Sequence, residues 1–275
     1  MDRKPLMQLV DVHKAYGGTE VLRGVTLNVY AGQTLCIIGG SGCGKTVTLK
    51  HLIGLTAPDS GRVLFDGRDV AEMTPRERVR MQTRFGMVFQ GGALFDSLDV
   101  GENVAFPMWA HTHLAECEIR ERVAQKLAVV GLHDVERKKP AELSGGMRKR
   151  VALARAIALD PEIVLFDEPT TGLDPVSADV INELILRTQR ALNTTAVVVT
   201  HDMASVYKVA DRVVMLFEGR LIVDGSPDAI RASTDPFVRR FIEGRADETF
   251  DAVNGSARAW PREEDTSADC ADDTD

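Results

Sequence analysis

The loop from Gly39 to Thr46 carries the clearest chemistry in the sequence, because it follows the pattern GxxxxGKT. The pattern comprises Gly39, Gly40, Ser41, Gly42, Cys43, Gly44, Lys45 and Thr46. Glycines let main-chain N–H groups close around phosphate oxygens, and the start of the following helix adds positive potential. We expect Lys45 to reach the β- and γ-phosphates and the Thr46 hydroxyl to bind Mg²⁺. The loop therefore predicts a binding site for a nucleoside triphosphate.

The flanking sequence favours this interpretation over a chance glycine-rich turn. The apolar run before the loop is typical of a strand and the run at 47–54 of a helix, which is the context that a phosphate-binding loop requires. The field of that helix start is also expected to lower the pKa of the Cys43 thiol. A small residue that simply fits is the simpler interpretation of Cys43.

A second cluster, Asp167 and Glu168, follows the apolar run at 162–166. Ligands of open α/β sheets lie beyond the C-terminal ends of the strands, so two carboxylates at such an end suit a catalytic site. We expect Asp167 to bind Mg²⁺, directly or through water, and Glu168 to orient and polarise the attacking water. A capped helix start is the weaker interpretation, because a phosphate loop lies upstream.

A third cluster, Ser144, Gly145 and Gly146, precedes an amphipathic run at 148–159. A serine cap followed by two glycines predicts a second helix N-terminus that can bind an anion. One chain has no obvious use for two such sites on one nucleotide. The chemistry of these residues alone leaves the purpose of the cluster open.

The elements that must position these clusters alternate between strands and helices. Branched apolar runs predict buried parallel strands at 35–39, 86–89, 162–166, 195–200 and 211–216. With helices between them, such as one from Asp174 to Asn193, they indicate an α/β sheet. Shorter alternating runs predict an antiparallel β layer at 8–12, 21–29 and 62–67. Charge pairs at helical spacing predict a helical lobe over about 97–155.

Composition narrows the class of protein. Apolar residues make up 44% of the 275 residues and charged residues 27%, and no window approaches the ~18 consecutive apolar residues of a membrane span. The N-terminal sequence shows no secretion signal, so the cytoplasm is the expected compartment. The four cysteines lack CxxC spacing, and we expect reduced thiols rather than a zinc site or disulfides.

The charge of the chain is concentrated near its C-terminal end. Residues 247–275 hold ten acidic and two basic residues, which leaves the remainder neutral and predicts no nucleic-acid partner. We expect residues 1–244 to form a nucleotide-binding domain and residues 245–275 an acidic, flexible tail. Phe250 and Trp260 in this tail are either incidental hydrophobic residues or anchors for a neighbouring subunit, and the sequence favours neither.

The order of these motifs resembles the ATPase subunit of ABC transporters over nearly the whole folded body. It joins the phosphate loop, Gln90, LSGGM at 143–147, LFDEP at 165–169, Asp174 and His201. The resemblance implies a P-loop cassette with a RecA-like core, an N-terminal antiparallel β layer and a helical lobe. It also implies that the nucleotide is ATP and that its metal is Mg²⁺.

The resemblance gives further residues a role. Tyr16 resembles the aromatic residue that stacks on adenine, with a core or hairpin tyrosine as the alternative. Gln90 is similar to the glutamine that contacts Mg²⁺ and water and senses the membrane partner. His201 matches the histidine that contacts the γ-phosphate. Asp174 matches the loop that links the two sites of a dimer, and an N-cap before Pro175 is an equally good role.

The resemblance also explains the third cluster. In this family two copies face each other head to tail, so Ser144, Gly145 and Gly146 of one copy would contact the γ-phosphate held by Lys45 of the other. Hydrolysis then lets the copies separate and drives a pair of membrane subunits. Met147 stands where many members carry glutamine, which bears on the subfamily rather than on activity.

Four stretches resemble one branch, the ATPases of lipid transporters that work with MCE-domain proteins, including the maintenance-of-lipid-asymmetry system and mycobacterial MCE relatives. They lie at 91–107, 110–114, 143–161 and 234–244. The branch implies transmembrane permease subunits, an MCE-domain lipid-binding protein and a small cytoplasmic regulatory subunit. It also implies a peripheral place on the cytoplasmic face of the inner membrane.

Three other functions are alternatives to this one. An importer ATPase for a small polar solute, such as an amino acid, differs in its docking surface and partner. A soluble ABC protein acting on DNA or ribosomes commonly has two cassettes or long coiled coils, whereas this chain has one P-loop and no sustained heptads. A nucleotide-gated module that hydrolyses little is disfavoured because Glu168, the expected base, is present.

Overall fold

The computed structural model describes residues 4–245, and the chain divides into two compact units, Met1–Ser233 and Thr234–Asp275. The described part of the second unit contains the helix α9 (Pro236–Glu243), which begins at an Asp235 cap. Phe250, Trp260 and nearly all of the predicted acidic tail lie outside the described residues. The domain boundary at 244 and the flexible tail stay predictions.

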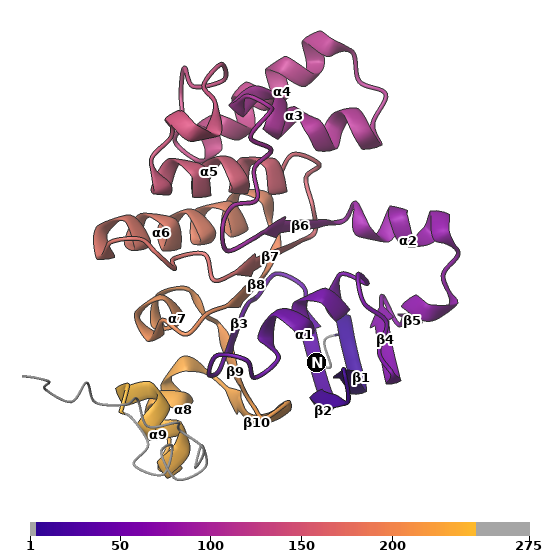
Figure 1. Cartoon of the computed structure of the whole chain (residues 1–275), viewed down its shortest axis with the longest axis vertical. Coiled ribbons are helices and arrows are strands. Elements are labelled where there is room, and N and C mark those ends of the chain that lie inside the picture. The colour runs from indigo at the N-terminus through magenta and orange to yellow at the C-terminus, as the bar shows by residue number, and fades with distance from the viewer. Residues whose placement is uncertain (1–3, 246–275) are drawn as a thin grey trace, which may run out of the picture. The chain divides into compact units, whose positions relative to one another are not determined.

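The first unit is built on a six-stranded sheet with the order β10-β9-β3-β8-β7-β6 (Figure 1). Its parallel strands are β3 (Thr34–Ile38), β6 (Phe85–Val88), β7 (Ile163–Asp167), β8 (Thr195–Val199) and β9 (Arg212–Phe217), and β10 (Arg220–Gly225) is antiparallel to β9. All residues of β3, β7 and β8 are buried, which is why their sequences are continuous apolar runs. The five predicted parallel strands are confirmed.

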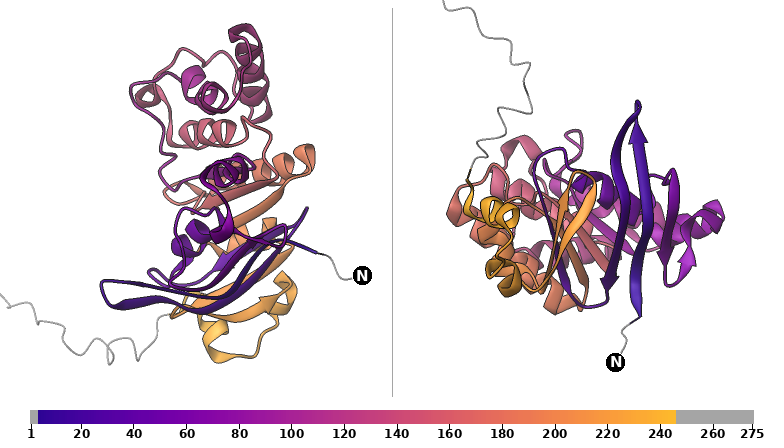
Figure 2. Two further views of the ribbon diagram at one scale, coloured as in Figure 1. Left: turned by 90° about the vertical axis from the view of Figure 1, so that its right-hand side faces the viewer. Right: turned by 90° about the horizontal axis from the view of Figure 1, so that it is seen from below.

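An antiparallel sheet with the order β2-β1-β4-β5 forms a second layer of this unit. Its strands are β1 (Pro5–Tyr16), β2 (Thr19–Tyr30), β4 (Ser60–Phe65) and β5 (Arg68–Asp69). Figure 2 shows β1 and β2 as one long hairpin. The helix α1 (Lys45–Leu52) contacts strands of both sheets, and apolar side chains from all three form one buried core. Burial of these apolar faces therefore fixes the helix that follows the phosphate loop.

The predicted helical lobe lies between β6 and β7. It contains α3 (Val100–His111), α4 (Glu116–Val129), the short η2 (Pro140–Glu142) and α5 (Gly145–Ala156). Helices α3, α4 and α5 pack against one another, and α5 also contacts β6 and the helix α6 (Pro175–Leu192) (Figure 1). The last helix of the lobe therefore touches the sheet that carries the carboxylates.

The remaining helices complete the α/β fold that the sequence predicts. They are η1 (Val70–Glu72), α2 (Pro75–Gln82), α7 (Met203–Val209) and α8 (Pro227–Arg231). Asp174 caps the start of helix α6, and Asn193, with its left-handed backbone, caps its end. Within residues 4–245, no helix combines the length and the apolar character that crossing a bilayer requires.

Candidate active site

The phosphate loop follows the buried end of β3 and turns into α1. At Gly39 (φ +151°) an added Cβ would lie 2.2 Å from the carbonyl oxygen of Leu216, and at Gly44 (φ +105°) it would lie 2.8 Å from Leu22 Cδ2. Glycine is therefore required at both positions, because the loop closes tightly against its neighbours. Among the described residues, no side chain caps α1 at Gly44, so the first N–H groups of the helix remain available to phosphate oxygens.

Lys45 lies over the inside of this loop. Lys45 is buried, and its Nζ donates to the carbonyl oxygens of Gly39 at 2.9 Å and Gly40 at 2.8 Å. The carbonyl oxygens of the loop therefore position the ammonium group at the loop, which suits an interaction with phosphate.

Two oxygen donors from different elements meet beside Lys45. Thr46 Oγ1, at the start of α1, donates to both carboxylate oxygens of Asp167, each at 3.2 Å. Asp167 ends β7 and is buried, and burial raises the pKa of its carboxyl while the Thr46 hydrogen bond lowers it. A hydroxyl and a carboxylate are the hard donors that Mg²⁺ prefers, and Mg²⁺ takes few protein ligands when it also binds phosphates. The donor set fits this metal.

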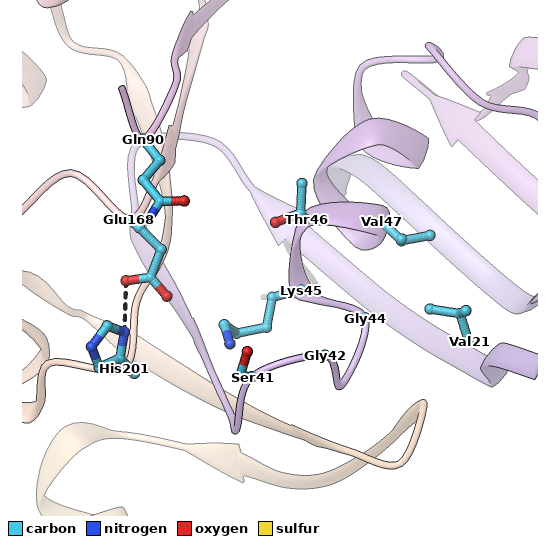
Figure 3. A pocket seen from close by; sticks show the side chains of 10 residues that line it. All are labelled: Val21, Ser41, Gly42, Gly44, Lys45, Thr46, Val47, Gln90, Glu168 and His201. Carbon is cyan, nitrogen blue, oxygen red and sulfur yellow. Dashed lines mark ion pairs between the residues drawn. The ribbon is translucent and has the colours of Figure 1, made fainter. Parts of the chain in front are cut away.

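A cavity of about 480 Å³ opens in front of the loop (Figure 3). Its lining joins the loop and the ends of three neighbouring strands: Val21, Ser41, Gly42, Gly44, Lys45, Thr46, Val47, Gln90, Glu168 and His201. Gln90 follows β6, Glu168 follows β7 and His201 follows β8, so parallel strands bring them to one edge of the sheet. The fold thus assembles eight predicted site residues, and it adds Val21 and Val47, which the sequence analysis missed.

Glu168 is held by two side chains. Its Oε2 accepts a hydrogen bond from Thr171 Oγ1 at 3.1 Å and lies 2.9 Å from His201 Nδ1, the contact dashed in Figure 3. The side chain of Glu168 is 12% exposed and that of His201 62%. A carboxylate fixed in this way at the cavity wall is suited to orient a water molecule for attack. Thr171 was missed, and the only signal for it was its position three residues after Glu168 in a turn.

Tyr16 lies at the end of β1, outside the residues that line this cavity. It is 48% exposed, which excludes a core tyrosine, and it lies opposite Thr19 in the β1–β2 hairpin, so the hairpin alternative remains. Lys14 Nζ lies 5.4 Å from the ring centroid, and Asp59 fixes this strand by accepting from Lys14 Nζ at 2.6 Å and from the Ala15 N–H at 2.7 Å. Stacking on adenine stays a prediction.

The third cluster is also separate from the cavity. Ser144 Oγ caps α5 by accepting from the Met147 N–H at 3.2 Å, as predicted for a serine cap. In the described part of the chain, a Cβ added to Gly146 would meet no atom within 4 Å. Gly145 and Gly146 therefore begin a helix whose N-terminus is open, and this chain does not place them on its own phosphate loop.

Asp174 performs one of its two predicted roles. Its Oδ1 accepts from the N–H groups of Val176 and Ser177, each at 3.0 Å, and hydrogen bonds from Ser177 lower the pKa of its carboxyl. The N-cap before Pro175 is therefore confirmed. The role of Asp174 between two sites of a dimer stays a prediction.

One electrostatic expectation for the loop was wrong. Burial raises the pKa of the Cys43 thiol, and the charge of Lys45 offsets only part of that rise. The helix start does favour a thiolate, but the side chain lies against Gly39, where desolvation of the charged form is the larger effect. Cys43 is therefore better described as the small residue that fits.

Comparison with known proteins supports this geometry. The profile of the ABC transporter family matches residues 22–171. The intermembrane phospholipid transport system ATP-binding protein MlaF of Haemophilus influenzae is 44% identical over 231 residues, 84% of this chain and 88% of that protein. The probable ribonucleotide transport ATP-binding protein mkl of Mycobacterium tuberculosis is 44% identical over 232 residues. That match covers 84% of this chain but only 65% of the mycobacterial protein.

Solved structures agree with the fold. The ATP-binding cassette MJ0796, in a dimeric post-hydrolysis state bound to ADP and Pi, superposes with a TM-score of 0.74 at 31% identity. The superposition covers 80% of this chain and 98% of that cassette.

Proposed function

This chain belongs to the ABC transporter family, and we propose from that membership that it is the ATP-hydrolysing subunit of a membrane transporter for phospholipid or another lipid. The observation that carries the ATPase part is the convergence of Lys45, Glu168 and His201 on one cavity (Figure 3). Lys45 begins α1 after the phosphate loop, whereas Glu168 and His201 follow the strands β7 and β8. Hydrogen bonds to Gly39 and Gly40 hold Lys45, and Glu168 and His201 contact each other.

The residues divide the reaction between them. Lys45 and the open N–H groups of α1 would bind the β- and γ-phosphates. Thr46, Asp167 and Gln90 would hold Mg²⁺, which neutralises charge on the phosphate oxygens. Glu168 would orient the attacking water, because Thr171 and His201 hold its carboxylate. His201 would also contact the γ-phosphate.

We assign the open helix start of α5 to a second copy of this chain. Ser144, Gly145 and Gly146 begin that helix away from their own phosphate loop, and Gly146 has room for an approaching group. The MJ0796 cassette, 31% identical, was captured as a dimer with ADP and Pi. Asp174 would lie in the loop that connects the two composite sites.

The membrane partner is supported by an apolar groove of about 300 Å³ between the sheet and the helical lobe. Phe89, Phe95 and Phe106 line it and are at least 40% exposed. Aromatic side chains of this kind are typical of a protein–protein interface. We propose that a transmembrane permease subunit docks there, which would place the chain on the cytoplasmic face of the inner membrane.

The lipid substrate is supported by the MlaF relatives, which act in intermembrane phospholipid transport and are 44% and 40% identical to this chain. An MCE-domain lipid-binding protein and a small regulatory subunit are the further proposed partners. The mkl description names ribonucleotide transport, so a polar-solute importer is the alternative to test. Purification of the native membrane complex would decide, because an MCE-domain companion supports lipid transport and a periplasmic solute-binding protein contradicts it.

The ATPase assignment is tested by Glu168→Gln. Loss of the proposed base should lower turnover by about 10²- to 10⁴-fold while ATP binding is retained. Phosphate release and ATP titration of the purified complex would measure the two quantities. Glu121→Gln is the matched control, since Glu121 is an exposed residue of α4 remote from the cavity lining. Equal turnover in the two variants would contradict the role of Glu168.

A further inference from the structure

Lys149 is a buried lysine in the second turn of α5 whose ammonium group reaches out of the helical lobe. The residue is 8% exposed. Its Nζ donates to the main-chain carbonyl of Gln90 and, at 3.4 Å, to the main-chain carbonyl of Glu168. One side chain therefore joins α5 to both strand ends that carry the proposed water-orienting residues.

The contact with Glu168 falls on an unusual stretch of backbone. Glu168 has a φ of +49°, a left-handed conformation that is unfavourable for a residue with a side chain and persists only when its surroundings fix it. Its N–H donates to the carbonyl oxygen of Val199 at 2.9 Å, and its own carbonyl accepts from Lys149. The Glu168 carbonyl also accepts from the Thr171 N–H at 3.3 Å. Lys149 is therefore one of the groups that hold the backbone from which the Glu168 carboxylate projects.

Helix α5 also holds the chain that leaves Gln90. Arg155 donates from Nη2 to the carbonyl oxygen of Gly92 at 2.9 Å and from Nη1 to that of Ala93 at 2.8 Å. With Lys149 on Gln90, the helix grips this segment at two points. A change in the orientation of α5 would therefore displace the segment from Gln90 to Ala93 together with the carbonyl of Glu168.

A buried ammonium group is costly unless polar groups compensate it. Burial lowers the pKa of Lys149, and the nearby carboxylates of Glu168 and Asp167 oppose that shift. An apolar side chain of similar length would fill the same space without this cost. The polar contacts, rather than packing, are therefore the physical reason for a lysine here.

We propose that Lys149 is a positioning residue that couples the orientation of α5 to the orientation of the Glu168 carboxylate in the same chain. The inference rests on the proposed ATP hydrolysis. Ser144 and Gly146 begin the helix that carries Lys149, so binding of the partner copy's ATP at that start would be transmitted through Lys149 to the hydrolytic residues of this chain. The two composite sites of a dimer would thereby sense one another.

The test compares Lys149→Met with Lys126→Met in the full-length chain within its complex. Lys126 is also 8% exposed and lies in the same lobe, where it pairs with Asp160. We expect Lys149→Met to lower kcat for ATP by about 10- to 100-fold, because the Gln90 carbonyl loses the hydrogen bond from Lys149 and the Glu168 carbonyl is left with the one from the Thr171 N–H. KM for ATP should change by no more than about twofold, and the same limit should hold for kcat of Lys126→Met.

Two further measurements separate positioning from damage to the fold. Lys149→Arg keeps the charge and the donors, so it should recover most of the lost kcat. In a Glu168→Gln background, Lys149→Met should still form the ATP-dependent dimer. The proposal is overturned if Lys149→Met and Lys126→Met lose kcat equally, if Lys149→Arg is no better than Lys149→Met, or if dimer formation is lost. Absence of ATPase activity in the unaltered complex would instead contradict the proposed function itself.

Discussion

Glycines lie at the starts of α1 and α5, and these two helix starts differ in how much of a binding site surrounds them. At α1 the glycines at 39, 42 and 44 have positive φ values, and the loop closes against β2 and β9. At α5 the start is capped by the chain's own Ser144, and Gly146 faces open space among the described residues. The side chains proposed to be catalytic surround the first start and not the second.

This difference indicates that a helix start becomes a complete anion-binding site only when side chains that bind the ligand surround it. The N–H groups at α1 are accompanied by Lys45, by the donors Thr46 and Asp167, and by the carboxylate of Glu168. The start of α5 offers N–H groups and partial positive charge alone. It can add to a site assembled elsewhere, which is why we assign it to the nucleotide of a second copy.

The largest expected effect concerns nucleotide binding by a single chain. Lys45→Ala removes the only cation that the loop itself holds in the described structure and should weaken ATP binding by about 10²-fold or more. Gly146→Asp should leave ATP affinity of the isolated chain unchanged, because α5 does not reach that cavity. ATP titration of each variant measures the contrast. Equal loss of ATP affinity in both variants would show that the two helix starts serve one site within one chain.

The next effect appears only when chains are mixed. Gly146→Asp places a carboxylate where the partner's γ-phosphate would lie, so it should suppress turnover about as strongly as Lys45→Ala does. A dimer of one Lys45→Ala chain and one Gly146→Asp chain retains one site made of an intact loop and an intact α5 start. An equal mixture should therefore regain up to about a quarter of the original activity if chains pair at random, and less to the extent that the two sites depend on one another.

The outcome of this mixing experiment separates two arrangements of the site. If each site lay within one chain, both chains of the mixed dimer would be defective and activity would stay at the level of the parents. Mixing each variant with itself is the control, since it changes neither pairing nor concentration.

Much of the fold was predictable because its elements are locally encoded. The runs that became β3, β7 and β8 are buried on both faces, so their apolar character needs no partner to be recognised. The same holds for the Asp174 cap and the Asn193 end of α6. The strand order β10-β9-β3-β8-β7-β6 depends on which strands pair across long stretches of chain, and local sequence does not specify that.

The site was predictable to the extent that its residues lie directly after strands or at the first turns of helices. Gln90, Glu168 and His201 could be placed at one sheet edge because parallel strands end together. Lys149 could not, since its proposed role depends on α5 lying against β6 with the carbonyls of Gln90 and Glu168 in reach, and a lysine among RKR in a helix is typical of an exposed face. The raised pKa of the Cys43 thiol likewise depends on burial against Gly39, which only the folded loop produces.

The smallest expected effect concerns the stability of the chain without nucleotide, which also distinguishes the enclosed start of α1 from the open start of α5. Gly44→Ala must adopt a φ of +105° with its Cβ 2.8 Å from Leu22 Cδ2 and 3.0 Å from the Val21 carbonyl oxygen. It should lower the free energy of unfolding by about 1–3 kcal/mol. Gly146 lies within α5 and its Cβ would meet nothing within 4 Å in the described chain, so Gly146→Ala should raise that free energy by up to about 1 kcal/mol. Urea midpoints of the two variants measure the difference, and a Gly146→Ala variant as unstable as Gly44→Ala would mean that the start of α5 is enclosed within its own chain rather than open to a partner.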